Sequence, residues 1–392
     1  MSDDNNVSTK KQDIHDDNQQ EKLVPELRFP EFKDNWKLIR LKNLINNESS
    51  KLSINNLEDN YGNYPLYGAS GFIKNINFYK KEENYIAIVK DGSGVGNSFI
   101  YNGKSSVVGT MQYLNTINNN DLKFAYYLLQ TLNLEKYKIG SSIPHIYFKD
   151  YSKEKIYLPS INEQKEISNF LSLIDKKIEL LEKKLVLWDK YIFSLKCKYF
   201  DNINVEKIVK FKEIIKKGKA GGTPKSSIQS YYNGEIPFLT INDMTKQGKF
   251  IKSTEKTITK EGLNNSSAWI VPKNSLLYSM YASIGFVSIN KIDLTTSQAI
   301  YSIILKDNVN QEYIFHYLKN YKRFIHKYIE TGTQGNLNSK IIKNIKIKLP
   351  SLEEQNYYSN LFNIFDYKIQ TLNTKIKQYK TFKKYLLQNM FI

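Results

Sequence analysis

Leu158-Pro159-Ser160-Ile161-Asn162-Glu163-Gln164 has a near copy in Leu349-Pro350-Ser351-Leu352-Glu353-Glu354-Gln355, which begins 191 residues later. The offset stays constant in the segments that follow, where Asp175 matches Asp366 and Leu195 matches Leu386. Such a repeat has to be identified before single elements are assigned, because each copy is one structural unit. We therefore expect the 392-residue chain to be an internal duplication.

Both copies predict the start of a long helix. A serine followed three residues later by a glutamate is a capping box, in which the serine hydroxyl accepts from the N3 amide and the glutamate binds the cap amide. Apolar residues then recur at alternating spacings of four and three, which is typical of a coiled-coil seam. In the first copy they stand at positions 167, 171, 174, 178, 181, 185, 188, 192 and 195. The second keeps Phe362, Phe365, Ile369, Leu372, Ile376, Tyr379 and Leu386, but has Lys383 where the first has Ile192.

The charge of the chain indicates a polyanionic partner. The net charge is +18, and residues 1–22 contain three lysines against six acidic residues, so the remainder carries +21. A protein this basic usually binds a polyanion, and nucleic acid is favoured over a membrane surface. A basic bias of the whole proteome is the alternative.

The sequence favours a cytoplasmic protein with no membrane association. Cys197 is the single cysteine, which excludes a disulfide within the chain and a cysteine-ligated zinc site and fits a reducing compartment. The acidic N-terminal segment lacks the apolar core of a signal peptide. No uncharged apolar run approaches the length of a membrane span.

The sequence before each long helix contains short segments with strand patterns and segments with helix patterns. Tyr85–Val89 and Phe99–Tyr101 are predicted strands, and the Asn102-Gly103 dipeptide after them predicts a hairpin turn. The fold class is therefore α+β, with two α/β globules separated by two long antiparallel coiled-coil helices in a pseudo-twofold repeat. The expected segments are a disordered acidic tail (1–24), a first globule (25–159), a central helix (160–203), a second globule (204–350) and a C-terminal helix (351–392).

Signatures of catalysis are weak or missing. Glu163-Gln164-Lys165 and Asp121-Leu122-Lys123 have the Asp/Glu-x-Lys form found in nucleases, but such triplets arise by chance in a charged sequence. The Asn/Asp-Pro-Pro-aromatic segment of amino-methylating DNA enzymes does not occur. Gly92-x-Gly94-x-Gly96 stands between two predicted strands, whereas a dinucleotide loop joins a strand to a helix. The four histidines are scattered, so we expect no metal, no cofactor and no catalysis by this chain alone.

These features together resemble one family, the specificity (S) subunit of type I restriction–modification enzymes. The resemblance covers residues 25–392. It rests on the paired helix starts, the opening Pro25-Glu26-Leu27-Arg28-Phe29-Pro30-Glu31-Phe32, Gly221-Gly222-Thr223-Pro224, Tyr232-x-Gly234-x-Ile236-Pro237-Phe238 and the Thr331-Gly332-Thr333 loop. The first half departs from the family by having Tyr67-Gly68-Ala69-Ser70-Gly71 where many members carry a Gly-Gly-Thr-Pro-like opening.

The resemblance implies two target-recognition domains, each reading one half of an interrupted site in double-stranded DNA. It also implies that the helices dock two methyltransferase subunits, which motor–nuclease subunits join. A helix of roughly 40 residues is about 60 Å long, or at most about 18 base pairs of DNA. We therefore expect the helices to act as a spacer that fixes the gap between the half-sites.

Base readout requires polar side chains on loops, with lysines nearby for phosphates. The candidates in the first globule are Tyr67, Ser70, Lys90, Ser93, Asn97, Lys104, Ser141, Ser142 and His145. Those in the second are Thr223, Lys225, Thr240, Asn242, Asp243, Tyr278, Ser279, Tyr281, Ser283, Gln298, Thr333, Gln334 and Asn336. Two alternatives stay open, namely the specificity chain of another bipartite system, such as a fused nuclease–methylase, and a coiled-coil scaffold with no DNA role.

Overall fold

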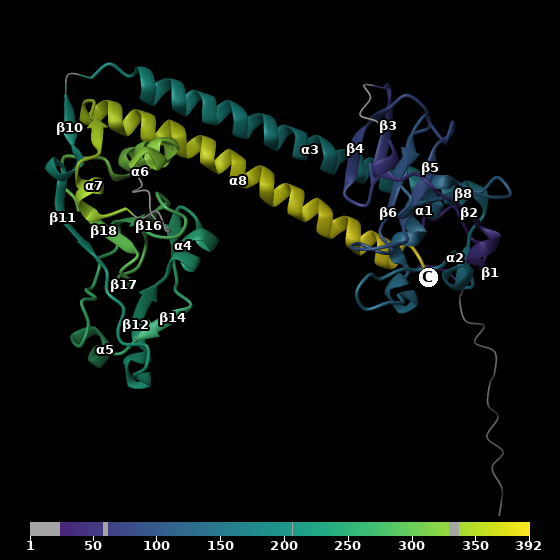
Figure 1. Cartoon of the computed structure of the whole chain (residues 1–392), viewed down its shortest axis with the longest axis horizontal. Helices are drawn as coiled ribbons and strands as arrows, with labels where there is room; N and C mark the ends of the chain where they lie inside the picture. Colours follow the sequence, from purple (N-terminus) through teal and green to yellow (C-terminus); the bar gives the residue numbers. More distant parts are fainter. Residues whose placement is uncertain (1–23, 58–61, 206, 329–336) are drawn as a thin grey trace, which may run out of the picture. The chain divides into compact units, whose positions relative to one another are not determined.

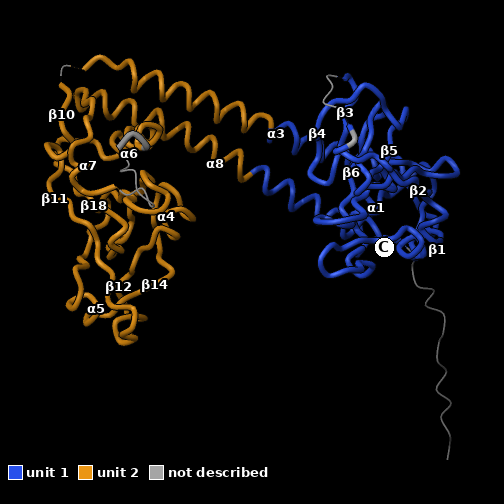
Figure 2. Tube along the Cα trace, viewed as in Figure 1, with its two compact units in different colours: residues 1–182, 375–392 blue, residues 183–374 orange. Residues whose placement is uncertain are grey.

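The structure, a computed structural model, describes residues 24–57, 62–205, 207–328 and 337–392 (Figure 1). It divides into unit 1, residues 1–182 and 375–392, and unit 2, residues 183–374 (Figure 2). The division passes through both long helices, so each unit joins a globule to one part of each helix. The predicted acidic tail lies outside the described residues except for its last position.

The two long helices are α3 (Ile161–Asn202) and α8 (Leu352–Asn389). The predicted seam is confirmed, since Ile167, Leu171, Ile178 and Ile192 are buried, whereas Leu173, one position away from the seam residue Ile174, is 65% exposed. Within each unit the segments of α3 and α8 lie side by side and antiparallel (Figure 2). Ion pairs join the two helices in both units.

Ion pairs join α3 to α8 in each unit, and in unit 1 they include Lys380 Nζ with Glu182 Oε1 at 2.7 Å. In unit 1, Lys383 Nζ near the end of α8 lies 2.7 Å from Asp175 Oδ1 near the start of α3. In unit 2, Lys196 Nζ near the end of α3 lies 2.8 Å from Asp366 Oδ1 near the start of α8. Because a late residue of one helix meets an early residue of the other in both units, the pairs establish the antiparallel arrangement.

In the described residues of unit 1, the globule has three small sheets and two short α-helices. A four-stranded sheet has the order β2-β8-β5-β6, a three-stranded sheet the order β4-β3-β7, and β1 pairs with β9. The strands are β1 (Lys37–Arg40), β2 (Ile45–Ser49), β3 (Tyr64–Gly68), β4 (Gly71–Ile76), β5 (Tyr85–Val89), β6 (Ser98–Tyr101), β7 (Ser106–Val107), β8 (Met111–Thr116) and β9 (Lys155–Leu158). The helices are α1 (Leu122–Thr131) and α2 (Phe148–Tyr151).

Unit 2 repeats this plan with one extra strand. Its five-stranded sheet has the order β11-β18-β15-β16-β13, its three-stranded sheet the order β14-β12-β17, and β10 pairs with β19. The strands are β10 (Ile208–Lys210), β11 (Ile215–Ala220), β12 (Tyr232–Leu239), β13 (Phe250–Ile251), β14 (Lys256–Ile258), β15 (Leu276–Ser279), β16 (Val287–Asn290), β17 (Thr295–Thr296), β18 (Ile300–Leu305) and β19 (Lys346–Lys348). The helices are α4 (Ile241–Gln247), α5 (Lys260–Asn264), α6 (Gln311–Tyr321) and α7 (Ser339–Lys343).

A glutamine at the same place in each repeat ties the long helix to its globule. Gln164 Nε2 donates to Pro159 O, and its Oε1 accepts from the amide of Asp121, the N-cap of α1. Gln355 makes the same two bonds, with Pro350 O and with the amide of the α6 N-cap. The glutamine of the repeated motif therefore sets how a globule helix meets its long helix.

The capping boxes form only in part. Ser160 Oγ accepts from the Glu163 amide at 3.4 Å, and Ser351 Oγ accepts from the Glu354 amide at 3.2 Å. The predicted return bond from Glu163 is wrong, because its carboxylate accepts instead from Arg28 Nε at 2.7 Å. The Arg28 side chain, distant in sequence, thus takes the place of the cap amide as the partner of the Glu163 carboxylate.

The turn at Asn102-Gly103 does not form the predicted hairpin. β6 pairs with β5, whereas the next strand, β7, pairs in parallel with β3 in the other sheet. The chain therefore changes sheets after the turn instead of folding back on β6. No helix in the described ranges is long and apolar enough to cross a membrane.

Candidate nucleic-acid interface

Two predicted loops of unit 1 lie against each other. The Gly92 amide, in the loop between β5 and β6, donates to Pro144 O at 2.8 Å, and the Ile146 amide donates to Lys90 O at 2.9 Å. The exposed residues Ser93, Asn97, Ser141 and Ser142 and the half-buried Lys90 and His145 therefore share one region.

The β3–β4 turn joins the same region through the start of β8. The Val108 amide donates to Tyr67 O at 3.0 Å, and the Lys90 amide donates to Thr110 O at 2.9 Å. Ser70 is exposed in this turn, whereas Tyr67 is half-buried with its ring stacked on Tyr101 at 3.9 Å between centroids. Three of the four predicted segments of the first globule thus meet at one end of its sheets.

Lys104 is not part of this cluster. It stands beyond the end of β6, whereas the β5–β6 loop precedes its start. Its backbone has φ 55°, and its Nζ lies 3.8 Å from Glu82 Oε1. Lys104 therefore lies at the opposite end of β6 from the clustered loops.

The loops of unit 2 meet through equivalent bonds. The Ser297 amide donates to Leu239 O at 3.0 Å, and the Met280 amide donates to Ala299 O at 2.8 Å. These match the Val108–Tyr67 and Lys90–Thr110 bonds of unit 1. Thr223 Oγ1 also donates to Gln298 Oε1. As a result, the exposed Thr223, Lys225, Asn242, Tyr281, Ser283 and Gln298 and the half-buried Thr240 all lie on segments of this cluster.

The turn between β15 and β16 has an unusual backbone. Ala282 and Ser283 have φ 37° and 46°, in the left-handed region that side chains disfavour. Ser279 Oγ stabilises the turn, since it lies 2.8 Å from Tyr281 O and 2.7 Å from Ala282 O. Unit 1 builds the corresponding turn with Gly92, which adopts its φ of 87° without that cost. Strain of this kind is often kept where a loop has a function.

Three predicted contact residues are buried. Tyr278 and Ser279 are 0% exposed on β15, and Asp243 is 1% exposed. Asp243 holds α4, because its Oδ2 accepts from the Thr240 amide at 2.9 Å and its Oδ1 from the Glu255 amide at 3.0 Å. The prediction that these three side chains contact bases is not compatible with their burial. Thr333, Gln334 and Asn336 lie outside the described residues.

Sequence reasoning missed residues 51–53. Ser49, the last residue of β2, pairs with Gln112, the second residue of β8. Ala220, the last residue of β11, pairs with Tyr301, the second residue of β18. The segment after β2 therefore matches the segment after β11. The structural counterpart of Gly221–Pro224 is thus residues 50–53, and the earlier placement at Tyr67–Gly71 is wrong. Lys51 and Ser53 are exposed there. Residue 50 stands nine positions after Leu41 and Gly221 ten positions after Phe211, since β11 has a bulge between Ile215 and Lys217. This near-equal spacing was the signal that could have located the segment.

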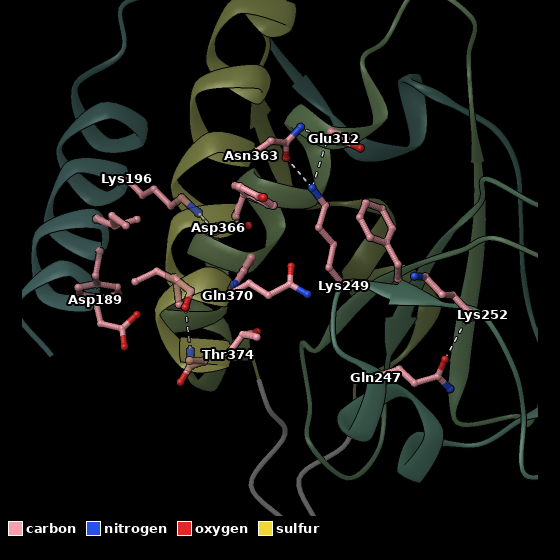
Figure 3. Close-up of a pocket in the computed structure, with 17 residues that line it drawn as sticks. Asp189, Lys196, Gln247, Lys249, Lys252, Glu312, Asn363, Asp366, Gln370 and Thr374 are labelled. Atoms are coloured by element: carbon pink, nitrogen blue, oxygen red, sulfur yellow. Dashed lines mark hydrogen bonds and ion pairs between the residues drawn. The ribbon is translucent and has the colours of Figure 1, made fainter. Parts of the chain in front are cut away.

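A cavity of about 1060 Å³ in unit 2 holds none of the predicted residues (Figure 3). Its inner charges are paired, since Lys196 binds Asp366 and Lys249 Nζ lies 3.1 Å from Glu312 Oε2. Asn363 Oδ1 accepts from Lys249 Nζ at 2.5 Å. The cavity therefore borders a structural network that joins the long helices to the globule.

Comparison with known proteins points to a single family. The sequence pattern described as "Type I restriction modification DNA specificity domain" matches residues 33–186 and again residues 203–380. The two matches cover more than half of the chain and coincide with the two copies of the repeat.

Curated relatives bear corresponding names. The type I restriction enzyme MjaVIII specificity subunit of Methanocaldococcus jannaschii is 26% identical, with 92% of each chain covered. The EcoR124I/EcoR124II specificity subunit of Escherichia coli is 26% identical over 68% of this chain and 69% of its own length. The MjaIX specificity subunit of M. jannaschii is 32% identical, but the match spans only 44% of this chain and 40% of that protein.

Solved structures confirm the predicted fold class. The type I restriction–modification S subunit from M. genitalium matches with a TM-score of 0.66 at 18% identity, over 94% of this chain and 99% of its own. A chain from a structure on complex assembly and conformational transition of the type I system matches with a TM-score of 0.56 at 13% identity, over 91% of this chain and 96% of its own. At these identities the likeness concerns the fold alone.

Proposed function

The chain belongs to the type I restriction modification DNA specificity family, and we propose that it selects a bipartite DNA site for a type I restriction–modification enzyme. In this proposal each globule reads one half-site in the double-stranded DNA. The chain itself carries no catalysis, and two methyltransferase subunits and the motor–nuclease subunits supply the chemistry.

The repeated loop cluster carries the proposal. Both units gather three equivalent segments through matching main-chain bonds, as in Lys90–Thr110 and Met280–Ala299. The exposed side chains differ, however, with Ser141 and Asn97 in one cluster and Gln298 and Tyr281 in the other. A common frame with different side chains is what two unlike half-sites require, because sequence is read by side chains at base edges.

The long helices support a spacer role. α3 contains 42 residues and is therefore about 63 Å long. At about 3.4 Å per base pair this length corresponds to at most about 18 base pairs. Half-sites about one helical turn apart face the same side of the duplex. We infer that the helix length determines the gap between the half-sites.

Apolar side chains outside the seam support docking of partner helices. In unit 1, Leu173 and Leu180 are 65% and 54% exposed on α3. In unit 2, Leu187 on α3 and Ile364 on α8 are 67% and 62% exposed. Exposed apolar residues that recur at helical spacings indicate an interaction surface. We assign these exposed positions, in each unit separately, to docking of the methyltransferase subunits.

Sequencing the methylome of cells that express the chain with its methyltransferase partner tests this function. We expect adenine methylation at one split motif. Exchange of residues 204–348 for those of a relative is expected to change one half of that motif and leave the other, because each globule reads alone. A continuous motif, no motif, or a change in both halves would contradict the proposal.

Two other functions predict different results. The specificity chain of another bipartite system also yields a split motif, but its neighbouring genes encode a fused nuclease–methylase. A scaffold without a DNA role predicts that the assembled complex binds DNA weakly or without salt dependence. Binding driven by phosphate contacts must weaken as salt rises.

A further inference from the structure

The loop before α2 in unit 1 exposes an apolar side chain at its tip. Ile143 stands between Ser142 and Pro144 and is 67% exposed. Among the described residues, its side chain belongs to neither hydrophobic cluster of unit 1. A single exposed apolar residue is ordinary on a protein surface, so its surroundings decide whether it has a role.

The tip is held rigidly from both sides. Ile139 and His145 exchange two main-chain hydrogen bonds of 2.9 Å each, which close the loop at its base. Pro144 O accepts from the Gly92 amide at 2.8 Å, which ties the tip to the β5–β6 loop. Beyond the base, Ile146 is 1% exposed and anchors the chain in the core. A loop whose main chain is held in this way loses little conformational freedom when it meets a ligand.

The serines near Ile143 are suited to hydrogen bonding, whereas Ile143 and Ile139, which is 52% exposed at the base of the loop, are not. Ser141 and Ser142 are exposed beside it, and Ser93 is exposed on the adjoining loop. In the major groove the 5-methyl group of thymine is the apolar group that distinguishes one base pair from the others. Apolar side chains recognise it by contact alone.

We propose that Ile143 contacts the 5-methyl group of a thymine in the half-site read by the first globule. It is then a specificity-determining residue, which favours thymine at one position. The inference rests on the proposed function and adds to it one base and one side chain.

Replacement of thymine by uracil removes only this methyl group and therefore tests the contact. The full-length chain, assembled with its methyltransferase partner, is given duplexes in which each thymine of the first half-site is replaced in turn. The first half-site is the one that persists when residues 204–348 are exchanged. We expect one replacement to slow methylation roughly four- to tenfold, the effect of one methyl contact. With Ile143→Ser the same replacement is expected to have no effect.

Leu38→Ser is the matched control. Leu38 is 51% exposed on β1, a strand that pairs only with β9 among the described strands. This variant loses a similar side chain and is expected to keep the full uracil effect. Thermal unfolding of both variants checks that the fold is unchanged.

The outcomes separate this inference from the function on which it rests. Three results overturn the inference and leave the function standing. The first half-site lacks thymine, or uracil at every position of that half-site leaves methylation unchanged, or the Ile143→Ser variant is still slowed by uracil. The absence of any split motif overturns both.

Discussion

Glu163 and Glu354 occupy the same position in the two repeats and have opposite surroundings. The Glu163 side chain is 2% exposed and accepts from Arg28 Nε and Nη2 at 2.7 and 2.8 Å. Trp36 Nε1 donates to the same carboxylate at 3.1 Å. Glu354 is exposed at the start of α8. The N-terminal segment is thus fastened to the start of α3 by a bond that has no counterpart at Glu354.

Replacing each glutamate by glutamine measures this difference. We expect Glu163→Gln to lower the free energy of unfolding of unit 1 by about 2–3 kcal/mol, because Arg28 is left without its charge partner. The value is below that for a fully buried pair, since Arg28 keeps 12% exposure. Glu354→Gln is the control and is expected to change stability by less than about 0.5 kcal/mol. Equal effects in calorimetry would mean that the Arg28 pair contributes nothing.

At the scale of elements, a buried histidine lies where α6 meets the two long helices in unit 2. His316 is 0% exposed, and its Nδ1 lies 3.4 Å from Lys196 Nζ on α3. Its Nε2 lies 3.0 Å from Asn363 Oδ1 on α8. Burial, reinforced by the charge of Lys196, lowers the pKa of His316 to about 3 from its ordinary value of 6.5. The imidazole is therefore neutral in the folded protein at neutral pH.

The lowered pKa of His316 predicts acid sensitivity. Below pH 6.5 the unfolded chain binds a proton at this residue while the folded chain does not, so stability falls as pH decreases from 6.5 towards 3. The expected loss from this one group is about 2 kcal/mol between pH 6.5 and 5. Denaturant unfolding at stepped pH measures it. His316→Gln is expected to flatten this part of the profile, and an unchanged slope would contradict the assignment.

At the scale of the whole molecule, the length of the helix pair is the quantity that the proposed function depends on. Removal of residues 181–187 and 372–378 deletes one heptad from equivalent places in α3 and α8, so the seam and the antiparallel pairing are kept. The helices shorten by about 10 Å. We expect the gap of the methylated motif to shrink by about 2–3 base pairs with both half-sites unchanged.

Deletion from α3 alone is the control for this change. It shifts one seam against the other and separates ion pairs such as Lys383–Asp175, so we expect a loss of stability and of methylation. Methylome sequencing of both variants distinguishes the outcomes. An unchanged gap in the double deletion would show that the helices do not set the spacing.

The sequence determined the architecture because the relevant signals are local and repeated. The seam spacing and the serine of each cap depend on neighbours within one or two helical turns. The duplication then assigned the same plan to both halves. Strand existence was also predictable, and β5 begins and ends where the pattern of Tyr85–Val89 placed it.

Contacts between residues far apart in the chain could not be predicted, because they depend on how the whole fold packs. Glu163 binds Arg28, which lies 135 positions away in the sequence. No local rule therefore predicts that the Glu163 carboxylate does not accept from the amide of the helix cap. Tyr278 and Ser279 are predicted base contacts, but their side chains are buried on β15. The match of residues 50–53 with Gly221–Pro224 follows from strand register, which is fixed by pairing between segments far apart in the chain. The periodicity of a helix can be read along the chain, whereas the surface formed by several loops depends on long-range packing.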